Sequence, residues 1–147
     1  MSSMSRMMSI SEQDRSWAKS ARAQFPHLTS YGYGLPDGCD DNWSETLSDD
    51  DIEMIIAARD FLSGFKPVEK VSYGSRTSYP SPTAMNLKDL LRNYNGTYVY
   101  EGAITLAASA LGLPIRNWAS HHAQIGVSRK QYKDLQKVVD YNRTHRQ

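Results

Sequence analysis

The apolar residues of segment 103–111 recur with the period of an α-helix. Positions i, i+3, i+4, i+7 and i+8 of this segment are occupied by Ala103, Leu106, Ala107, Ala110 and Leu111. Gly112 predicts the end of the helix, and Thr97 offers a side chain that can cap its start. Because several of these residues are small, another helix can approach closely. The pattern favours a fold built from packed helices.

Capping residues, apolar periodicity and stop signals predict five further helices. We expect them at about 11–24, 49–63, 82–95, 114–125 and 129–141. The clearest start is at Ser48, which precedes three aspartates that favour the positive end of a helix dipole. Segments 25–43 and 66–82 contain many glycines and prolines and are predicted to be long loops. The predicted fold class is mainly α, with five to six helices in one compact domain and a small strand pair as an option.

The length of 147 residues suits one domain with its own core. We expect residues 1–10 to form a disordered N-terminal tail, 11–141 a single helical domain, and 142–147 a frayed C-terminal tail. The apolar faces of the helices predict the core residues. These are Trp17, Ile52, Ile55, Ile56, Phe61, Leu62, Leu87, Leu90, Leu91, Leu106, Ala107, Leu111, Leu135 and Val138.

Charge is distributed unevenly although the net charge is only +1. Residues 37–60 hold nine acidic side chains and one arginine, whereas residues 61–147 hold twelve Lys or Arg and five Asp or Glu. The basic half permits contact with nucleic acid, and the alternative is two differently charged solvated faces. Cys39 is the only cysteine, so no intrachain disulfide forms, and no apolar run is long enough to span a membrane. A cytoplasmic location, in a host cell, is the expectation.

The segment ITLAASALGLPIRNWASHHAQI has the spacing of a helix-turn-helix. Ala107 and Ala108 permit a close helix crossing, Gly112 suits the turn, and Trp118 is placed to anchor the second helix. His121 departs from the pattern, which expects an apolar residue there, so an ordinary helical corner is the alternative. Contacts with nucleic acid are expected from Arg116, Asn117, Ser120, Arg129, Lys130, Lys133 and Lys137.

The loop 66–82 interleaves aromatic and basic residues. Tyr73, Arg76 and Tyr79 form a pattern that can stack on single-stranded bases. The alternative is that these aromatic side chains cover part of the core.

An acidic stretch offers a second kind of partner. It consists of Asp37, Asp40, Asp41, Glu45, Asp49 and Asp50, which lack the spacing of a calcium-binding loop. The stretch can dock on a basic surface of another protein, or it can simply form turns and aid solubility.

Sequence motifs of catalysis are absent, including a Walker loop, G-x-S-x-G and H-E-x-x-H. His121 and His122 are adjacent and would diverge on a helix, so we predict no metal site. Folding could bring Glu101 to either histidine, although no spacing demands it. We expect no enzymatic activity and no cofactor.

Within residues 52–115 the segments IIAARDFLSGFKPVEKVSYGS, NLKDLL and TYVYEGAITLAASALGLPI follow one another. This order resembles that of small uncharacterised proteins of phages and plasmids, in which a Ser-Tyr-Gly segment precedes a basic helix and then a Tyr-Val…Gly-Ala-rich helix. The inserted RTSYPSP run, which separates Ser72-Tyr73-Gly74 from Lys88, departs from that pattern. The group has no established activity, so the resemblance implies only an origin in a mobile element.

The leading hypothesis is a non-enzymatic accessory protein that regulates by binding DNA through the helix-turn-helix-like corner around Gly112. The alternative is an inhibitor that binds a host defence complex, such as an anti-CRISPR or another anti-defence protein, through the acidic stretch. A third hypothesis is a scaffolding part that self-assembles. The expected partner is DNA or a nucleic-acid-handling protein complex, with no membrane and with a homodimer as an option.

Overall fold

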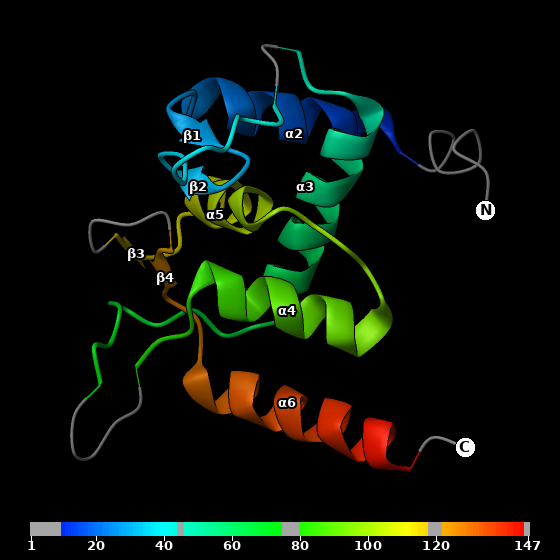
Figure 1. The fold of residues 1–147 in the computed structure, drawn as a ribbon, viewed down its shortest axis with the longest axis vertical. Coiled ribbons are helices and arrows are strands. Elements are labelled where there is room, and N and C mark those ends of the chain that lie inside the picture. The colour runs from blue at the N-terminus through cyan, green and yellow to red at the C-terminus, as the bar shows by residue number, and fades with distance from the viewer. Residues whose placement is uncertain (1–9, 44–45, 75–79, 118–121, 146–147) are drawn as a thin grey trace.

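The computed structural model describes residues 10–43, 46–74, 80–117 and 122–145. In these residues the chain forms five helices and two antiparallel strand pairs, so the prediction of a mainly α fold is confirmed (Figure 1). The elements are α2 (Glu12–Gln24), β1 (Leu28–Thr29), β2 (Gly32–Tyr33), α3 (Asp49–Ser63), α4 (Ala84–Asn95), α5 (Glu101–Ala110), β3 (Ile115–Arg116), β4 (Gln124–Ile125) and α6 (Arg129–Thr144).

Short polar side chains cap four of the five described helices, and these caps are Ser11, Ser48, Thr83 and Ser128. The Ser48 hydroxyl accepts from the Asp51 amide at 3.1 Å, and the Asp51 carboxylate accepts from the Ser48 amide at 3.2 Å. Thr83 caps α4 in the same reciprocal way with Asn86, so this helix begins two residues later than the expected start at position 82. The expected cap at Thr97 was also wrong, because α5 begins at Glu101.

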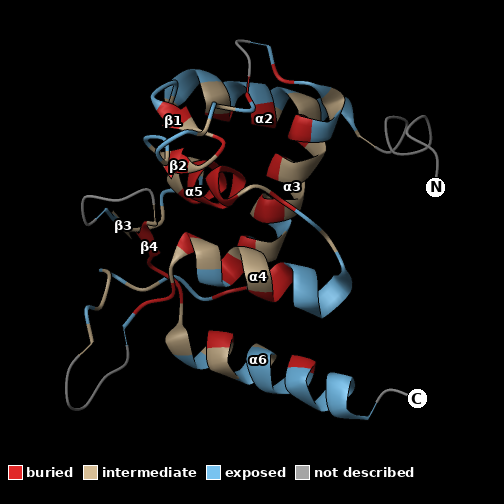
Figure 2. Cartoon of the chain, viewed as in Figure 1, coloured by how far each residue is buried: buried red, intermediate tan, exposed pale blue. Residues whose placement is uncertain are grey.

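Helix α5 lies at the centre of the core, and α2, α3, α4 and the β1–β2 hairpin all contact it (Figures 1 and 2). Its first eight residues are all buried. This environment explains why the helix is rich in alanine, since larger residues would not fit on every side. Gly102 packs directly on the hairpin, and a Cβ atom there would lie 2.1 Å from the Thr29 carbonyl oxygen.

The predicted core is largely correct, with two errors. Leu111 is 37% exposed and Val138 is 47% exposed. Leu111 follows the last turn of α5, where the chain leaves the core. Val138 lies on α6, whose buried residues are Tyr132 and Val139 and whose other side is exposed (Figure 2).

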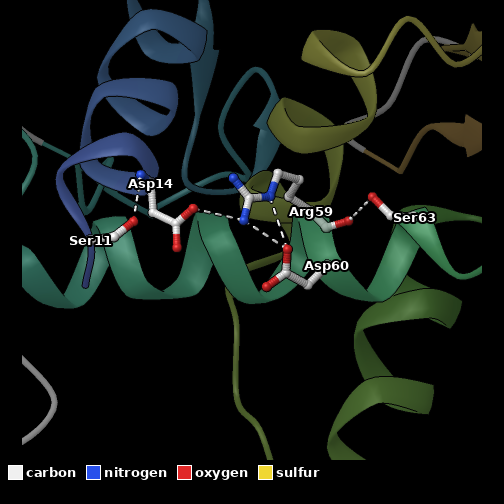
Figure 3. Close-up of polar contacts among 5 residues, drawn as sticks. All are labelled: Ser11, Asp14, Arg59, Asp60 and Ser63. Carbon is white, nitrogen blue, oxygen red and sulfur yellow. Dashed lines mark hydrogen bonds and ion pairs between the residues drawn. The ribbon is translucent and has the colours of Figure 1, made fainter. Parts of the chain in front are cut away.

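Polar contacts hold α2 against α3 (Figure 3). The Arg59 guanidinium bonds the carboxylate of Asp14 at 3.0 Å and that of Asp60 at 2.8 Å, and it also lies 5.1 Å from the Trp17 ring centroid. Its side chain is only 19% exposed, so water screens these contacts less than it would on an open surface. Arg59 therefore links α3 to two residues of α2.

Candidate nucleic-acid interface

The segment expected to be a recognition helix is a β-hairpin. Ile115 pairs with Ile125, and Arg116 pairs with Gln124, in antiparallel register. The prediction of a helix over 114–125 was therefore wrong. Trp118, Ser120 and His121, which the helix-turn-helix hypothesis used, lie outside the described residues.

The turn before the hairpin was placed correctly. Gly112 has φ of 78°, a left-handed conformation that favours glycine. The Gly112 amide donates to the Ser109 carbonyl and the Leu113 amide to the Ala108 carbonyl, which is the Schellman pattern at a helix end. The corner is therefore a helix stop followed by extended chain.

Backbone contacts outside the hairpin explain why residues 124–126 are extended. The Ile125 amide donates to the Pro82 carbonyl at 2.9 Å, and the Gly126 amide donates to the Pro114 carbonyl at 2.7 Å. A Cβ atom at Gly126 would lie 2.8 Å from Pro114 Cβ, so only glycine permits this approach. Gly126 thus serves the close packing of this extended chain on Pro114.

The segment 66–74 runs beside the hairpin and is fixed to it. The Val68 amide donates to the Gly126 carbonyl, and the Ser128 amide donates to the Lys66 carbonyl. The buried Gln124 side chain donates through Nε2 to the carbonyl oxygens of Ser72 and Ser81, each at 3.1 Å. These bonds join a loop, a strand and the start of α6 into one frame.

A cavity of about 670 Å³ lies between this loop segment and β3, lined by residues 69–73 and 114–116. On its wall the Arg116 guanidinium carbon lies 4.3 Å from the Tyr73 ring centroid, within cation–π range. Tyr73 is 48% exposed, and Arg116 and Lys70 are also exposed. We call this the Tyr73–Arg116 cavity. The cavity brings together Tyr73, which was expected to stack on single-stranded bases, and Arg116, which was expected to contact nucleic acid from a recognition helix.

The other expected nucleic-acid contacts are spread along the neighbouring elements. Asn117 follows β3 and is exposed. Arg129 begins α6 and lies 4.8 Å from the Tyr132 ring centroid, so it packs partly on the protein itself. Lys130 is ion-paired with Asp134 at 3.0 Å, while Lys133 and Lys137 lie further along the same helix.

Tyr132 lies on the same helix, and its pKa is raised above the ordinary value of a tyrosine. Burial of the side chain is the largest cause of this shift.

The acidic stretch is not a uniform surface. The Asp41 carboxylate accepts from the amides of Ser30 and Trp43, at 2.9 and 3.0 Å, and so holds a loop together. Asp49 is ion-paired with Arg15. Asp37, Asp40 and Asp50 are exposed, and Glu45 lies outside the described residues. Among the described residues of the stretch, therefore, only Asp37, Asp40 and Asp50 are exposed.

Folding brings Glu101 to one of the two adjacent histidines. The Glu101 carboxylate is 4% exposed and lies 2.8 Å from Nδ1 of His122, which is 40% exposed. A carboxylate that orients an imidazole is a common arrangement in proton-transfer sites and also in structural contacts. No sequence spacing indicated this pair, because its members lie 21 positions apart, one on α5 and the other in the segment that joins β3 to β4.

Comparison with protein-family models, with curated proteins and with solved structures finds no match for this chain. Within the described residues, no three His, Cys, Asp or Glu side chains are grouped so as to hold a metal ion. None of the described helices has the length and apolar character needed to cross a bilayer.

Proposed function

We propose that this chain is a non-enzymatic accessory protein that binds nucleic acid at the Tyr73–Arg116 cavity. The observation that carries the proposal is the contact between the Arg116 guanidinium and the Tyr73 ring at the cavity wall. An arginine beside an exposed aromatic ring supplies both a phosphate partner and a stacking surface. Nucleic acid is the partner that the sequence analysis also expected. The proposed binding surface, however, is formed by a loop and a hairpin in place of a recognition helix.

Cations near the cavity support the same proposal. Lys66 and Lys70 lie on the loop segment whose backbone is bonded to Ser128, the residue that caps α6. Helix α6 then presents Lys130, Lys133 and Lys137 at positions i, i+3 and i+7, which lie near one face of a helix. A phosphate backbone that enters the cavity can continue along this helix.

The direct test is binding of a fluorescent oligonucleotide to the purified chain, measured by anisotropy. Arg116→Ala is expected to weaken binding about fivefold to a hundredfold, because one charged contact is worth about 1–3 kcal/mol. Arg92→Ala is the matched control, since Arg92 is an exposed arginine of α4 whose side chain is 52% exposed. Equal affinities for the wild type and Arg116→Ala would overturn the proposed surface.

An inhibitor of a nucleic-acid-handling protein complex is the second candidate, and the exposed Asp37 and Asp40 favour it. Its test is Asp37→Lys with Asp40→Lys, which should abolish binding to a basic protein partner and leave folding intact. Asp41 must stay unchanged in this test, because its carboxylate accepts two backbone hydrogen bonds.

A further inference from the structure

We infer that the Tyr73–Arg116 cavity takes an unstacked base of a single-stranded nucleic acid. This inference rests on the proposed function and specifies its ligand. It follows from the shape of the cavity, the chemistry of its walls and the hydrogen bonds that fix Ser72, the residue before Tyr73.

Shape is the first argument. The cavity of about 670 Å³ is a recess between a loop and a hairpin, of a size typical of small-molecule sites. In a duplex both faces of each base are covered by neighbouring bases, and the backbone keeps the bases away from such a recess. A base can enter it only when it is unstacked, as in single strands and loops.

The chemistry of the walls is the second argument. Val71, Pro114 and Ile115 give apolar surface that suits the faces of a base. Glu69 contributes a carboxylate, which accepts hydrogen bonds from the amino groups of bases. Lys70 lies beside it and is suited to the adjoining phosphate.

A tyrosine ring and a guanidinium group lie together at the wall of the cavity. Tyr73 contacts the Arg116 guanidinium and still exposes 48% of its surface. Both groups are planar, and bases stack on tyrosine rings and on guanidinium planes alike. This stacking does not depend on the identity of the base, so we expect any preference among bases to come from Glu69 and to favour bases that carry an amino group.

Hydrogen bonds hold the backbone of Ser72, next to Tyr73, in place. Ser72 and Ser81 bond each other twice, through the Ser81 amide to the Ser72 carbonyl and through the Ser72 amide to the Ser81 hydroxyl, both at 2.9 Å. The Gln124 side chain bonds both of their carbonyls. The residue before Tyr73 is therefore fixed before any ligand arrives, which lowers the entropic cost of binding.

The test compares three kinds of fluorescent probe of about 12 nucleotides, a length within the range of single-strand site sizes. They are a single strand (as DNA and as RNA), the same sequence as a duplex, and an abasic single strand that keeps the phosphates. We expect the single strand, in at least one of its two forms, to bind at least about tenfold more tightly than the duplex. The abasic strand should bind more weakly than the intact strand because it has no base to stack.

The variants are Tyr73→Ala and Tyr73→Phe, with Tyr98→Ala as the matched control. Tyr98 is also an exposed tyrosine with a cation over its ring, Lys88, but it lies near Asp50 and Glu53, away from the cavity. Tyr73→Ala should weaken single-strand binding about tenfold to hundredfold, while Tyr73→Phe stays within about twofold. Tyr98→Ala should leave the affinity for the single strand unchanged.

The outcomes separate the inference from the proposed function. If duplex and single strand bind equally, or if Tyr73→Ala leaves single-strand affinity unchanged while Arg116→Ala lowers it, the single-strand inference is overturned and nucleic-acid binding stands. If no probe binds, the proposed function fails as well. If only the intact single strand depends on Tyr73, and the abasic strand does not, the inference is supported.

Discussion

The carboxylate of Glu101, buried in the first turn of α5, lies 2.8 Å from Nδ1 of His122, which stands two residues before β4. The pair connects the central helix of the core to the hairpin that carries Arg116. Because the hairpin forms one wall of the Tyr73–Arg116 cavity, this contact helps to position the candidate site without contributing to its lining.

A double-mutant cycle measures this contact. Glu101→Ala and His122→Ala are each expected to lower the free energy of unfolding by about 1–3 kcal/mol, since each removes one partner of the contact and His122→Ala leaves the buried Glu101 carboxylate without it. The double variant should cost less than the sum of the two, with a coupling of about 0.5–3 kcal/mol. Chemical denaturation monitored by circular dichroism gives all four values. Strict additivity would show that the two side chains do not interact in solution.

Gly102 is predicted to be intolerant of any side chain. Gly102→Ala places a Cβ atom 2.1 Å from the Thr29 carbonyl oxygen, so α5 and the β1–β2 hairpin must separate, at a cost of about 1–3 kcal/mol or more. Gly64→Ala is the matched control, because its Cβ atom meets only the Phe61 carbonyl oxygen at 3.4 Å and its φ is −79°. The control should change the melting temperature little, and a similar loss in both variants would contradict this packing.

Tyr132 makes stability sensitive to alkaline pH. Burial is the largest cause of its raised pKa, with Asp89 adding to it and Arg129 opposing it. In the unfolded chain the Tyr132 phenol ionises with a pKa of about 10, which is lower than its pKa in the folded protein. The contribution of the protonated Tyr132 phenol to the free energy of unfolding is therefore complete below about pH 10. It is lost as the pH rises from there through the pKa of Tyr132 in the folded protein.

Tyr132→Phe removes this titration, so its thermal stability should fall less steeply than that of the wild type above about pH 10. Melting temperatures across that range compare the two proteins. Parallel curves would mean that Tyr132 ionises equally in the folded and unfolded states.

Arg59→Lys tests the contact between α2 and α3 (Figure 3). Lysine keeps the charge but cannot bond Asp14 and Asp60 through a planar fork while lying over Trp17. We expect a loss of about 1–2 kcal/mol, because Arg59 is mostly buried. Lys130→Arg, at an exposed ion pair on α6, should be neutral. Equal unfolding midpoints for Arg59→Lys and the wild type would mean that the planar guanidinium of Arg59 does not stabilise the contact between α2 and α3.

Local signals predicted the parts of the fold that depend on neighbouring residues. Ser48 forms the expected cap of α3, and Gly112 follows α5 in a left-handed conformation, as expected of a helix end. These features form within one turn of a helix, so a short stretch of sequence contains the whole interaction.

The hairpin at 115–125 was missed because its determinants are distant in the sequence. Residues 124–126 bond Pro82 and Pro114, and Gln124 bonds Ser72 and Ser81. Periodicity over a short window cannot register such partners, and Pro114 after Gly112 also fits a helix start. The candidate site was half predicted for the same reason: Arg116 and Tyr73 were both identified, but only the fold places them together.

The salt dependence of single-strand binding tests the central claim, nucleic-acid binding at the Tyr73–Arg116 cavity, most directly. The logarithm of the association constant should fall linearly with the logarithm of salt concentration, with a slope of about −0.7 for each phosphate contact. Lys70→Ala and Arg116→Ala should each make the slope shallower by about 0.7, whereas Arg92→Ala should leave it unchanged. An unchanged slope in both cavity variants, or no binding even at low salt, would contradict the account.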